Sequence, residues 1–201
     1  MNLPKSDLEE IYQNTKDDIQ KLAGKICLVL GHAGFLGQLF KQFVLYINEV
    51  YLNKPCFLIC IDNYIGKTKP KSIDDKNFLF IDHDLIVPLG VKLNDFQLHY
   101  IINFSGNASP NFYRTYGYET LTVSTIAINH LLELALVQKA RILNFSSSEL
   151  LAHVSEKYIP TDEEAPISVL TMNPRLIYDA GKLYIEAASW WFKQRYNLDC
   201  K

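Results

Sequence analysis

The sequence lacks an excess of charge of either sign. Among its 201 residues, 20 are lysine or arginine and 22 are aspartate or glutamate, a formal net charge of −2. This balance removes the electrostatic attraction that draws proteins non-specifically to nucleic acid or to anionic membranes. With 48% hydrophobic residues, the chain has enough apolar side chains for one substantial core. We expect neither nucleic acid nor a membrane as a partner.

Cysteine is also scarce, and its spacing excludes two further classes. Cys27, Cys56, Cys60 and Cys200 are arranged neither as metal ligands with histidine nearby nor as a disulfide framework, so we predict no metal site. Read along the sequence, no apolar run has membrane-spanning length. The first ten residues are polar and acidic, unlike a signal peptide. These features favour a reducing cytoplasm.

Glycines are few, but three of them follow one apolar run. Residues 26–37 read Ile-Cys-Leu-Val-Leu-Gly-His-Ala-Gly-Phe-Leu-Gly, which places Gly31, Gly34 and Gly37 at three-residue spacing. The pattern predicts a buried parallel strand, a tight turn and the start of a helix, where backbone without Cβ atoms can approach a pyrophosphate. Taken alone, the spacing also suits any strand-to-helix turn. His32 we interpret as a tolerated turn residue.

A second apolar run, residues 56–61, ends at Asp62 and Asn63. In dinucleotide-binding folds an acid after the second strand accepts hydrogen bonds from the adenosine ribose. Its charge also repels the extra phosphate of NADP, although Lys67, Lys69 and Lys71 just beyond it would partly offset that repulsion. We therefore predict NAD as the cofactor; the alternative is that Asp62 merely ends a strand.

Strand and helix patterns alternate along the chain. Helical spacing predicts an N-terminal helix over 7–22, capped by Ser6, in an extension covering residues 1–24. Over residues 25–201 we predict strands at 26–30, 56–61, 77–81, 99–104 and 141–145, and helices at 35–51, 119–138 and 175–196. This alternation predicts an α/β fold, a doubly wound parallel sheet of the Rossmann type with helices on both faces.

The last residues, 197–200, have the pattern of a strand that is just beginning. A doubly wound dinucleotide fold has a sixth strand, so we expect the domain to stop before that strand. Most of a C-terminal substrate domain would then be absent.

Two further motifs indicate catalysis. Ser146-Ser147-Ser148-Glu149 follows the fifth predicted strand, at the edge where open α/β sheets bind ligands. Tyr178 and Lys182 are four residues apart, a spacing that places both side chains on one face of a helix. A phenol is a weak base at neutral pH, and a neighbouring ammonium group favours its phenolate form. A hydroxyl from the strand edge can hold the substrate oxygen while the tyrosine removes its proton.

These motifs, in this order, resemble the NAD-dependent sugar epimerase/dehydratase family of extended short-chain dehydrogenases/reductases, and within it the UDP-glucuronate decarboxylases. The resemblance runs from about residue 25 to the end and implies NAD, a nucleotide sugar similar to UDP-glucuronate, and catalysis by Ser147, Glu149, Tyr178 and Lys182. The cofactor-binding residues that it implies are Gly31, Gly34, Phe35, Leu36, Gly37, Asp62, Asn63, Asp84, Leu85, Tyr178 and Lys182. The implied substrate-binding residues are Ser109, Pro110, Tyr113, Ser147 and Ser148.

The pair Ser148-Glu149 bears on the reaction. Within the resembling family, sugar dehydratases tend to have Asp-Glu at these positions, epimerases small or hydroxyl residues, and decarboxylases Ser-Glu, as here. Oxidation at C4 of the sugar would make a C5 carboxylate labile, and return of the hydride would make the reaction redox-neutral. Glu149 would position the substrate or relay a proton; the alternative is a solvated loop carboxylate.

Three functions compete on this evidence: a decarboxylase, a nucleotide-sugar 4,6-dehydratase or epimerase, and an inactive truncated NAD-binding module. The resemblance also implies a homodimer formed through helices 119–138 and 175–196. The second of these is apolar around much of its girth, which favours burial against two partners; its residues include Leu183, Ala187, Ala188, Trp190, Trp191 and Phe192.

Overall fold

The computed structural model describes residues 3–65, 67, 69, 76–89, 93, 95–152, 154–166, 173 and 175–201. Lys71 and most of the lysine-rich loop at 66–72 lie outside the described residues. Five parallel strands form one sheet in the order β3-β2-β1-β4-β5. The strands are β1 (Ile26–Leu30), β2 (Phe57–Asp62), β3 (Phe78–Asp82), β4 (Tyr100–Asn103) and β5 (Arg141–Asn144). The predicted Rossmann-type α/β fold is therefore confirmed.

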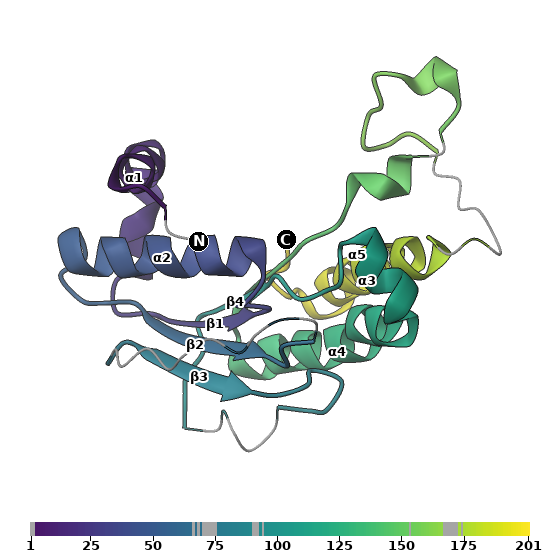
Figure 1. Cartoon of the computed structure of the whole chain (residues 1–201). Coiled ribbons are helices and arrows are strands. Elements are labelled where there is room, and N and C mark those ends of the chain that lie inside the picture. The colour runs from purple at the N-terminus through teal and green to yellow at the C-terminus, as the bar shows by residue number, and fades with distance from the viewer. Residues whose placement is uncertain are drawn as a thin grey trace.

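Helices cover both faces of this sheet, with α2 on one side and α4 and α5 side by side on the other (Figure 1). The α-helices are α1 (Lys5–Ile19), α2 (Phe35–Val50), α3 (Pro110–Thr115), α4 (Gly117–Gln138) and α5 (Leu176–Tyr196). Short 3₁₀ turns are formed by η1 (Gln20–Leu22), η3 (Ser148–Leu151) and η4 (Glu156–Tyr158). The segment containing η3 and η4 extends away from the sheet (Figure 1).

The central strand β1 is apolar throughout because both of its faces are buried. Leu28 belongs to the core beneath α4 and α5, whereas its neighbour Val29 belongs to the core beneath α2. Successive side chains on a strand point to opposite faces, so β1 and β2 each supply both cores. On the helices, Ile47 of α2 and Leu131 of α4 are almost fully buried against these two faces.

The N-terminal helix packs on α2. The prediction that Ser6 caps it is wrong: the helix begins at Lys5, Pro4 occupies the N-cap position, and no side chain caps it. Glu9 instead accepts hydrogen bonds from the hydroxyls of Tyr46 and Tyr51, the latter at 2.6 Å. These hydrogen bonds lower the pKa of Glu9 from 4.5 to about 2. The Tyr12 ring stacks on Tyr51, so the helix is attached by polar and aromatic contacts together.

The end of the chain runs alongside β5. Cys200 forms a parallel bridge with Ile142, and Asn144 N–H donates to the Lys201 carbonyl at 2.9 Å. Asn197 ends α5 in the left-handed conformation, with φ of 53°. The predicted beginning of a strand at 197–200 is thus confirmed as a single bridge, next to the outer edge of β5.

One helix, α4, has the length and composition of a membrane span, with a mean hydropathy of 1.5 over its most apolar window. The sequence analysis did not anticipate this. A core helix of a globular domain has the same properties, and Ala127, Ile128 and Leu132 of α4 are fully buried in the core shared with the sheet.

Candidate functional site

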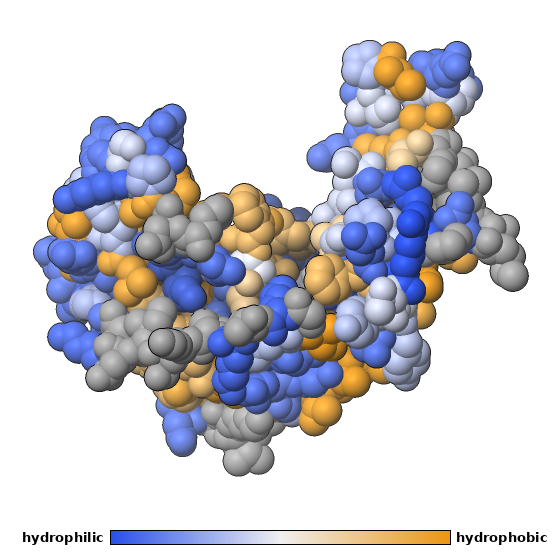
Figure 2. Space-filling model, viewed as in Figure 1, coloured by the Kyte–Doolittle hydropathy of each residue, from blue (hydrophilic) through white to orange (hydrophobic). Residues whose placement is uncertain are grey.

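A cleft of about 680 Å³ opens at the carboxyl ends of the strands. Its walls come from the turn after β1, the ends of β2 and β3, the loop after β4 and the start of α4. In Figure 2 the molecule has a broad hollow between the side that carries α1 and the raised segment that contains η3 and η4, with apolar residues on its floor. In open parallel sheets this edge is where ligands bind. The described residues that line the cleft include Gly31, Gly34, Phe35, Leu36, Gly37, Asp62, Asn63, Lys67, His83, Asp84, Leu85, Asn107, Tyr118, Glu119 and Thr122.

The three glycines of the turn are needed for different reasons. Gly31 has φ of +72°, and a Cβ there would lie 2.8 Å from the Phe104 backbone. A Cβ on Gly37 would lie 2.5 Å from the Gly31 carbonyl oxygen, closer than real Cβ atoms come. Gly34 is less crowded, with 3.2 Å to the same oxygen, and it lines the cleft. Gly31 and Gly37 therefore shape the turn, and Gly34 keeps its surface free of a side chain.

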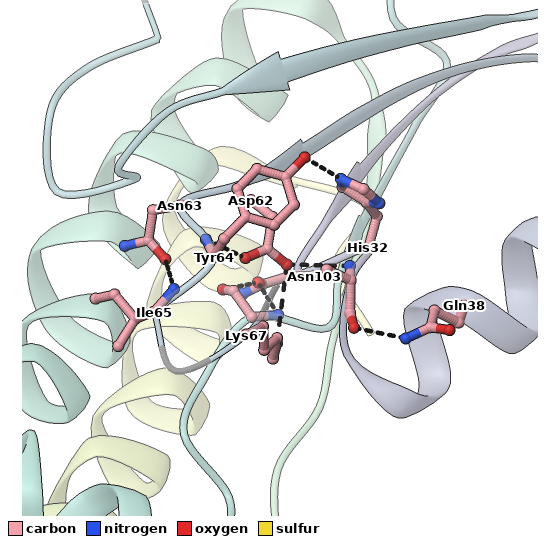
Figure 3. Close-up of polar contacts among 10 residues, drawn as sticks. His32, Gln38, Asp62, Asn63, Tyr64, Ile65, Lys67 and Asn103 are labelled. Atoms are coloured by element: carbon pink, nitrogen blue, oxygen red, sulfur yellow. Dashed lines mark hydrogen bonds and ion pairs between the residues drawn. The ribbon is translucent and has the colours of Figure 1, made fainter. Parts of the chain in front are cut away.

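Asp62 joins the turn to the end of β2 (Figure 3). Its Oδ2 accepts the Ala33 N–H at 3.0 Å, and its Oδ1 accepts the Tyr64 N–H at 2.8 Å. Lys67 Nζ lies 3.9 Å from Oδ2. The carboxylate is only 6% exposed, and the part that is accessible faces the cleft. Asp62 thus holds the turn in place and presents a buried negative charge with an accessible edge.

His32 lies behind this turn and is fully buried. Its Nε2 is 3.1 Å from the Tyr64 hydroxyl, and its ring centroid is 5.2 Å from that of Phe80. Burial lowers the pKa of His32 from 6.5 to about 4, and the nearby Lys41 ammonium adds to this. His32 is therefore a neutral packing residue near neutral pH, in agreement with its interpretation as a tolerated turn residue.

All nine predicted cofactor residues that precede the catalytic motifs line this single cleft: Gly31, Gly34, Phe35, Leu36, Gly37, Asp62, Asn63, Asp84 and Leu85. Their roles stay predictions. The loop after β4, which the resemblance places beside the cofactor and sugar, lines the cleft through residues 104–108, whereas the start of α4 was not anticipated as a wall. Asn107 belongs to this loop, and its amide donates to Thr120 Oγ1 at 3.1 Å. At the end of β4, Asn103 donates to Asn144 Oδ1 at 3.0 Å. Local sequence patterns do not indicate these contacts because they depend on how separate elements meet.

Tyr178 and Lys182 lie one turn apart on α5. Lys182 Nζ donates to the Phe145 carbonyl at 2.6 Å and lies 5.6 Å from the centroid of the Tyr178 ring. Lys182 is 7% exposed, and burial lowers its pKa. On its other side Tyr178 stacks with Tyr113 of α3, with ring centroids 5.7 Å apart. The helix thus brings a phenol and an ammonium group together, as the four-residue spacing predicted.

The serine-rich segment forms a 3₁₀ turn that faces the start of α5. Ser147 Oγ accepts the Glu149 N–H at 3.3 Å, Ser148 is exposed, and the Glu149 carboxylate forms an ion pair with Arg175. No local sequence pattern singles out Arg175, because its partner Glu149 is 26 positions away.

The predicted catalytic and substrate-binding residues do not line the 680 Å³ cleft among the described residues. They occupy a separate region formed by α3, η3 and the first turns of α5. Ser109 and Pro110 are exposed at the start of α3, whereas Tyr113 is buried. The cleft therefore holds nine of the eleven predicted cofactor residues, whereas Tyr178 and Lys182 lie with the other predicted catalytic residues outside its lining.

Comparison with known proteins gives a consistent family. The family model described as the NAD dependent epimerase/dehydratase family matches residues 27–201. Among curated proteins, the chain is 28% identical over 181 residues to UDP-glucuronic acid decarboxylase 1 of Xenopus tropicalis, covering 88% of this chain and 39% of that protein. It is also 28% identical to UDP-glucuronic acid decarboxylase 6 of Arabidopsis thaliana, covering 87% of this chain and 48% of that protein.

Solved structures share the fold. An epimerase from Methanothermobacter thermautotrophicus superposes with a TM-score of 0.71 at 21% identity, covering 94% of this chain and 53% of that one. The dTDP-glucose 4,6-dehydratase of Bacillus anthracis, solved in complex with NAD, gives 0.68 at 21% identity, covering 88% and 52%. The chain thus spans about half the length of the proteins that it matches.

Proposed function

The chain belongs to the NAD dependent epimerase/dehydratase family, and from this premise we propose that it binds NAD in the cleft and modifies a nucleotide sugar. The observation that carries the proposal is the meeting of the glycine turn with Asp62 at one edge of the sheet. Free N–H groups where α2 begins favour a pyrophosphate, and a carboxylate at the end of β2 accepts hydrogen bonds from a ribose.

The residues of the cleft fit this cofactor. Gly34 leaves room for close approach to the turn, since a side chain there would stand in the cleft. Phe35 and Leu36 are 66% and 47% exposed on its wall, and apolar surface of this kind favours a bound ligand. Asp84 and Leu85, after β3, would border the adenine. Tyr178 and Lys182 would reach the nicotinamide end from α5.

We propose further that the reaction is a decarboxylation similar to that of the UDP-glucuronate decarboxylases. Two observations support it. The curated relatives at 28% identity carry that name, and Ser148-Glu149 is the pair that the resemblance associates with decarboxylases. A dehydratase would need an acid where Ser148 stands, and the Ser148 hydroxyl is a poor proton donor. The substrate would be a nucleotide sugar with a C5 carboxylate, similar to UDP-glucuronate, acted on in the cytoplasm.

Each catalytic residue has a role in this scheme. NAD, when bound, accepts a hydride from C4 of the sugar and later returns it. Tyr178 removes the proton of the C4 hydroxyl, helped by the neighbouring Lys182 ammonium. Ser147 holds the same oxygen through its hydroxyl. Glu149, which belongs to the 3₁₀ turn that Ser147 caps, positions the sugar. Carbon dioxide leaves C5 because a carbonyl at C4 accepts the electrons of the broken bond, and the resulting enolate takes up a proton from water at C5. The returned hydride and the proton given back by Tyr178 then restore the C4 hydroxyl.

A second candidate is an NAD-binding module that turns over no sugar. It is favoured by the position of the predicted catalytic residues, which do not line the cleft among the described residues. Catalysis requires a substrate held firmly against the cofactor. A chain that lacks contacts to the nucleotide sugar would bind NAD without performing the reaction.

We also propose a homodimer through α4 and α5. Trp190 and Trp191 on α5 are 61% and 55% exposed, and Ile126 on α4 is 40% exposed. The outer surface of this helix pair therefore carries large apolar side chains, which are the residues that a subunit interface buries. A measured mass of twice 23.1 kDa in solution supports the dimer, and a monomeric mass refutes it.

The reaction is tested by product identification. The 201-residue chain is incubated with NAD and UDP-glucuronate, and in parallel with dTDP-glucose and UDP-glucose, and products are assigned by NMR. Release of carbon dioxide from UDP-glucuronate alone supports the decarboxylase, provided that Tyr178→Phe abolishes it. A 4-keto-6-deoxy product from dTDP-glucose, or an epimerised hexose from UDP-glucose, would replace it. Tight NAD binding without any product would favour the binding module.

A further inference from the structure

Four polar contacts connect the end of β5 and the segment after it to α5. On the helix they range from Ser189 back to Arg175, the N-cap residue. The pairs are Asn144 with Ser189 at 3.0 Å, Phe145 O with Lys182 at 2.6 Å, Ser146 with Glu186, and Glu149 with Arg175. Glu149 and Arg175 form the pair at the N-terminal end of α5.

We propose that Arg175 is a positioning residue for Glu149, an inference that rests on the function proposed above. The guanidinium holds the Glu149 carboxylate over the first turn of α5, one turn before Tyr178. Both side chains remain partly accessible, 37% for Arg175 and 40% for Glu149. Glu149 Oε2 is buried against the guanidinium, so a ligand would meet the remaining, accessible part of the side chain.

The contact also determines what Glu149 can do. A guanidinium is permanently charged and presents several donors in a planar fork that matches a carboxylate. Glu149 accordingly presents a hydrogen-bond acceptor toward a substrate hydroxyl, in a direction set by Arg175.

The contribution to the stability of the whole fold is expected to be small, because partly exposed ion pairs contribute little. The contribution to local order is larger. Glu149 belongs to the 3₁₀ turn η3, whose amides are bound only within the turn: Leu150 N–H to the Ser147 carbonyl at 3.3 Å and Ala152 N–H to the Glu149 carbonyl at 3.0 Å. Arg175 holds this turn against α5 together with the buried Leu150 side chain and the neighbouring contacts of Phe145 and Ser146.

The first test needs no turnover. Hydrogen exchange is measured at the amides of Glu149, Leu150 and Ala152 in the unmodified chain, in Arg175→Gln and in Arg175→Lys. We expect exchange at these amides to accelerate by about tenfold or more in Arg175→Gln, with Arg175→Lys in between and the β1 amides unchanged. The matched control is Arg141→Gln, which removes another partly exposed ion pair, with Asp199 at 2.6 Å, and should leave η3 unchanged. Equal protection of η3 in all four proteins would overturn the proposal.

The second test separates positioning from binding. With UDP-glucuronate, Arg175→Gln should lower kcat on the order of tenfold to a hundredfold, as misplaced catalytic groups do, and change KM by less than about twofold. Arg175→Lys should restore part of kcat. The double variant Glu149→Gln/Arg175→Gln should be no slower than Glu149→Gln alone, because Arg175 acts through Glu149. Additive losses would contradict the inference. If the unmodified chain has no turnover, the proposed function fails, and hydrogen exchange alone decides the role of Arg175.

Discussion

The same substitution at two glycines of the turn after β1 should affect mainly stability at Gly37 and mainly NAD binding at Gly34. At Gly37 the added methyl group would meet backbone atoms, the Gly31 oxygen at 2.5 Å and His32 Cα at 2.6 Å. Backbone cannot move aside cheaply, so overpacking should cost up to about 3 kcal/mol. Alanine regains about 1 kcal/mol of helix propensity at this position. The net loss of about 2 kcal/mol corresponds to a fall in Tm of about 4–8 °C.

At Gly34 the same methyl group meets only the Gly31 oxygen at 3.2 Å and the end of the Lys67 side chain at 3.5 Å. Loss of the glycine N-cap of α2 costs about 1 kcal/mol at most. The methyl group would, however, stand where the backbone approaches a pyrophosphate. We therefore expect Gly34→Ala to lower Tm by only about 2–4 °C while weakening NAD binding by about tenfold or more.

The assay pairs a thermal melt with an NAD titration on both variants and the unmodified chain. We expect Gly37→Ala to be the less stable of the two variants. We expect Gly34→Ala to be folded but deficient in NAD binding. Gly34→Ala binding NAD as tightly as the unmodified chain would refute the assignment of the cofactor to this turn. A Gly37→Ala protein more stable than Gly34→Ala would refute the packing argument.

Three further outcomes follow from the charged groups. The pKa of His32 is lowered from 6.5 to about 4, so the folded protein should be fully stable above pH 6.5 and should lose about 3 kcal/mol of stability as pH falls toward 4. Urea unfolding across this range should show the loss, and His32→Asn should flatten this dependence of stability on pH. Glu9 has its pKa lowered from 4.5 to about 2, so Glu9→Gln should lower Tm at pH 7, and the difference from the unmodified chain should shrink as pH falls from 4.5 toward 2. Asp62→Asn keeps an acceptor for Ala33 but removes the charge, so the ratio of NADP to NAD affinity should rise by about tenfold or more; an unchanged ratio in competitive titrations would contradict the role of Asp62.

The fold could be predicted because its causes are local. Apolar runs of strand length, a glycine turn and helical spacing each depend on neighbouring residues, and the parallel sheet follows from their alternation. Even the bridge at Cys200 followed from a short run of residues. The prediction for Ser6 failed because Pro4 already starts α1, and attachment of the helix depends on Glu9 and on distant tyrosines.

The site could be predicted only in part. Gly34 and Asp62 belong to a motif whose spacing reports a turn, and both line one cleft. The spacing of Tyr178 and Lys182 likewise reports a helix face. By contrast, Arg175 acquires its partner only when η3 meets α5, and no local pattern contains that contact. The same limit explains why the start of α4 was not anticipated as a wall of the cleft.

We would first titrate the 201-residue chain with NAD at equilibrium, with NADP in parallel. This measurement asks whether the chain binds NAD at the glycine turn. Circular dichroism of the same sample establishes that the protein is folded. The account predicts saturable binding with NAD preferred over NADP. A folded chain that binds neither nucleotide, or that prefers NADP, would contradict it.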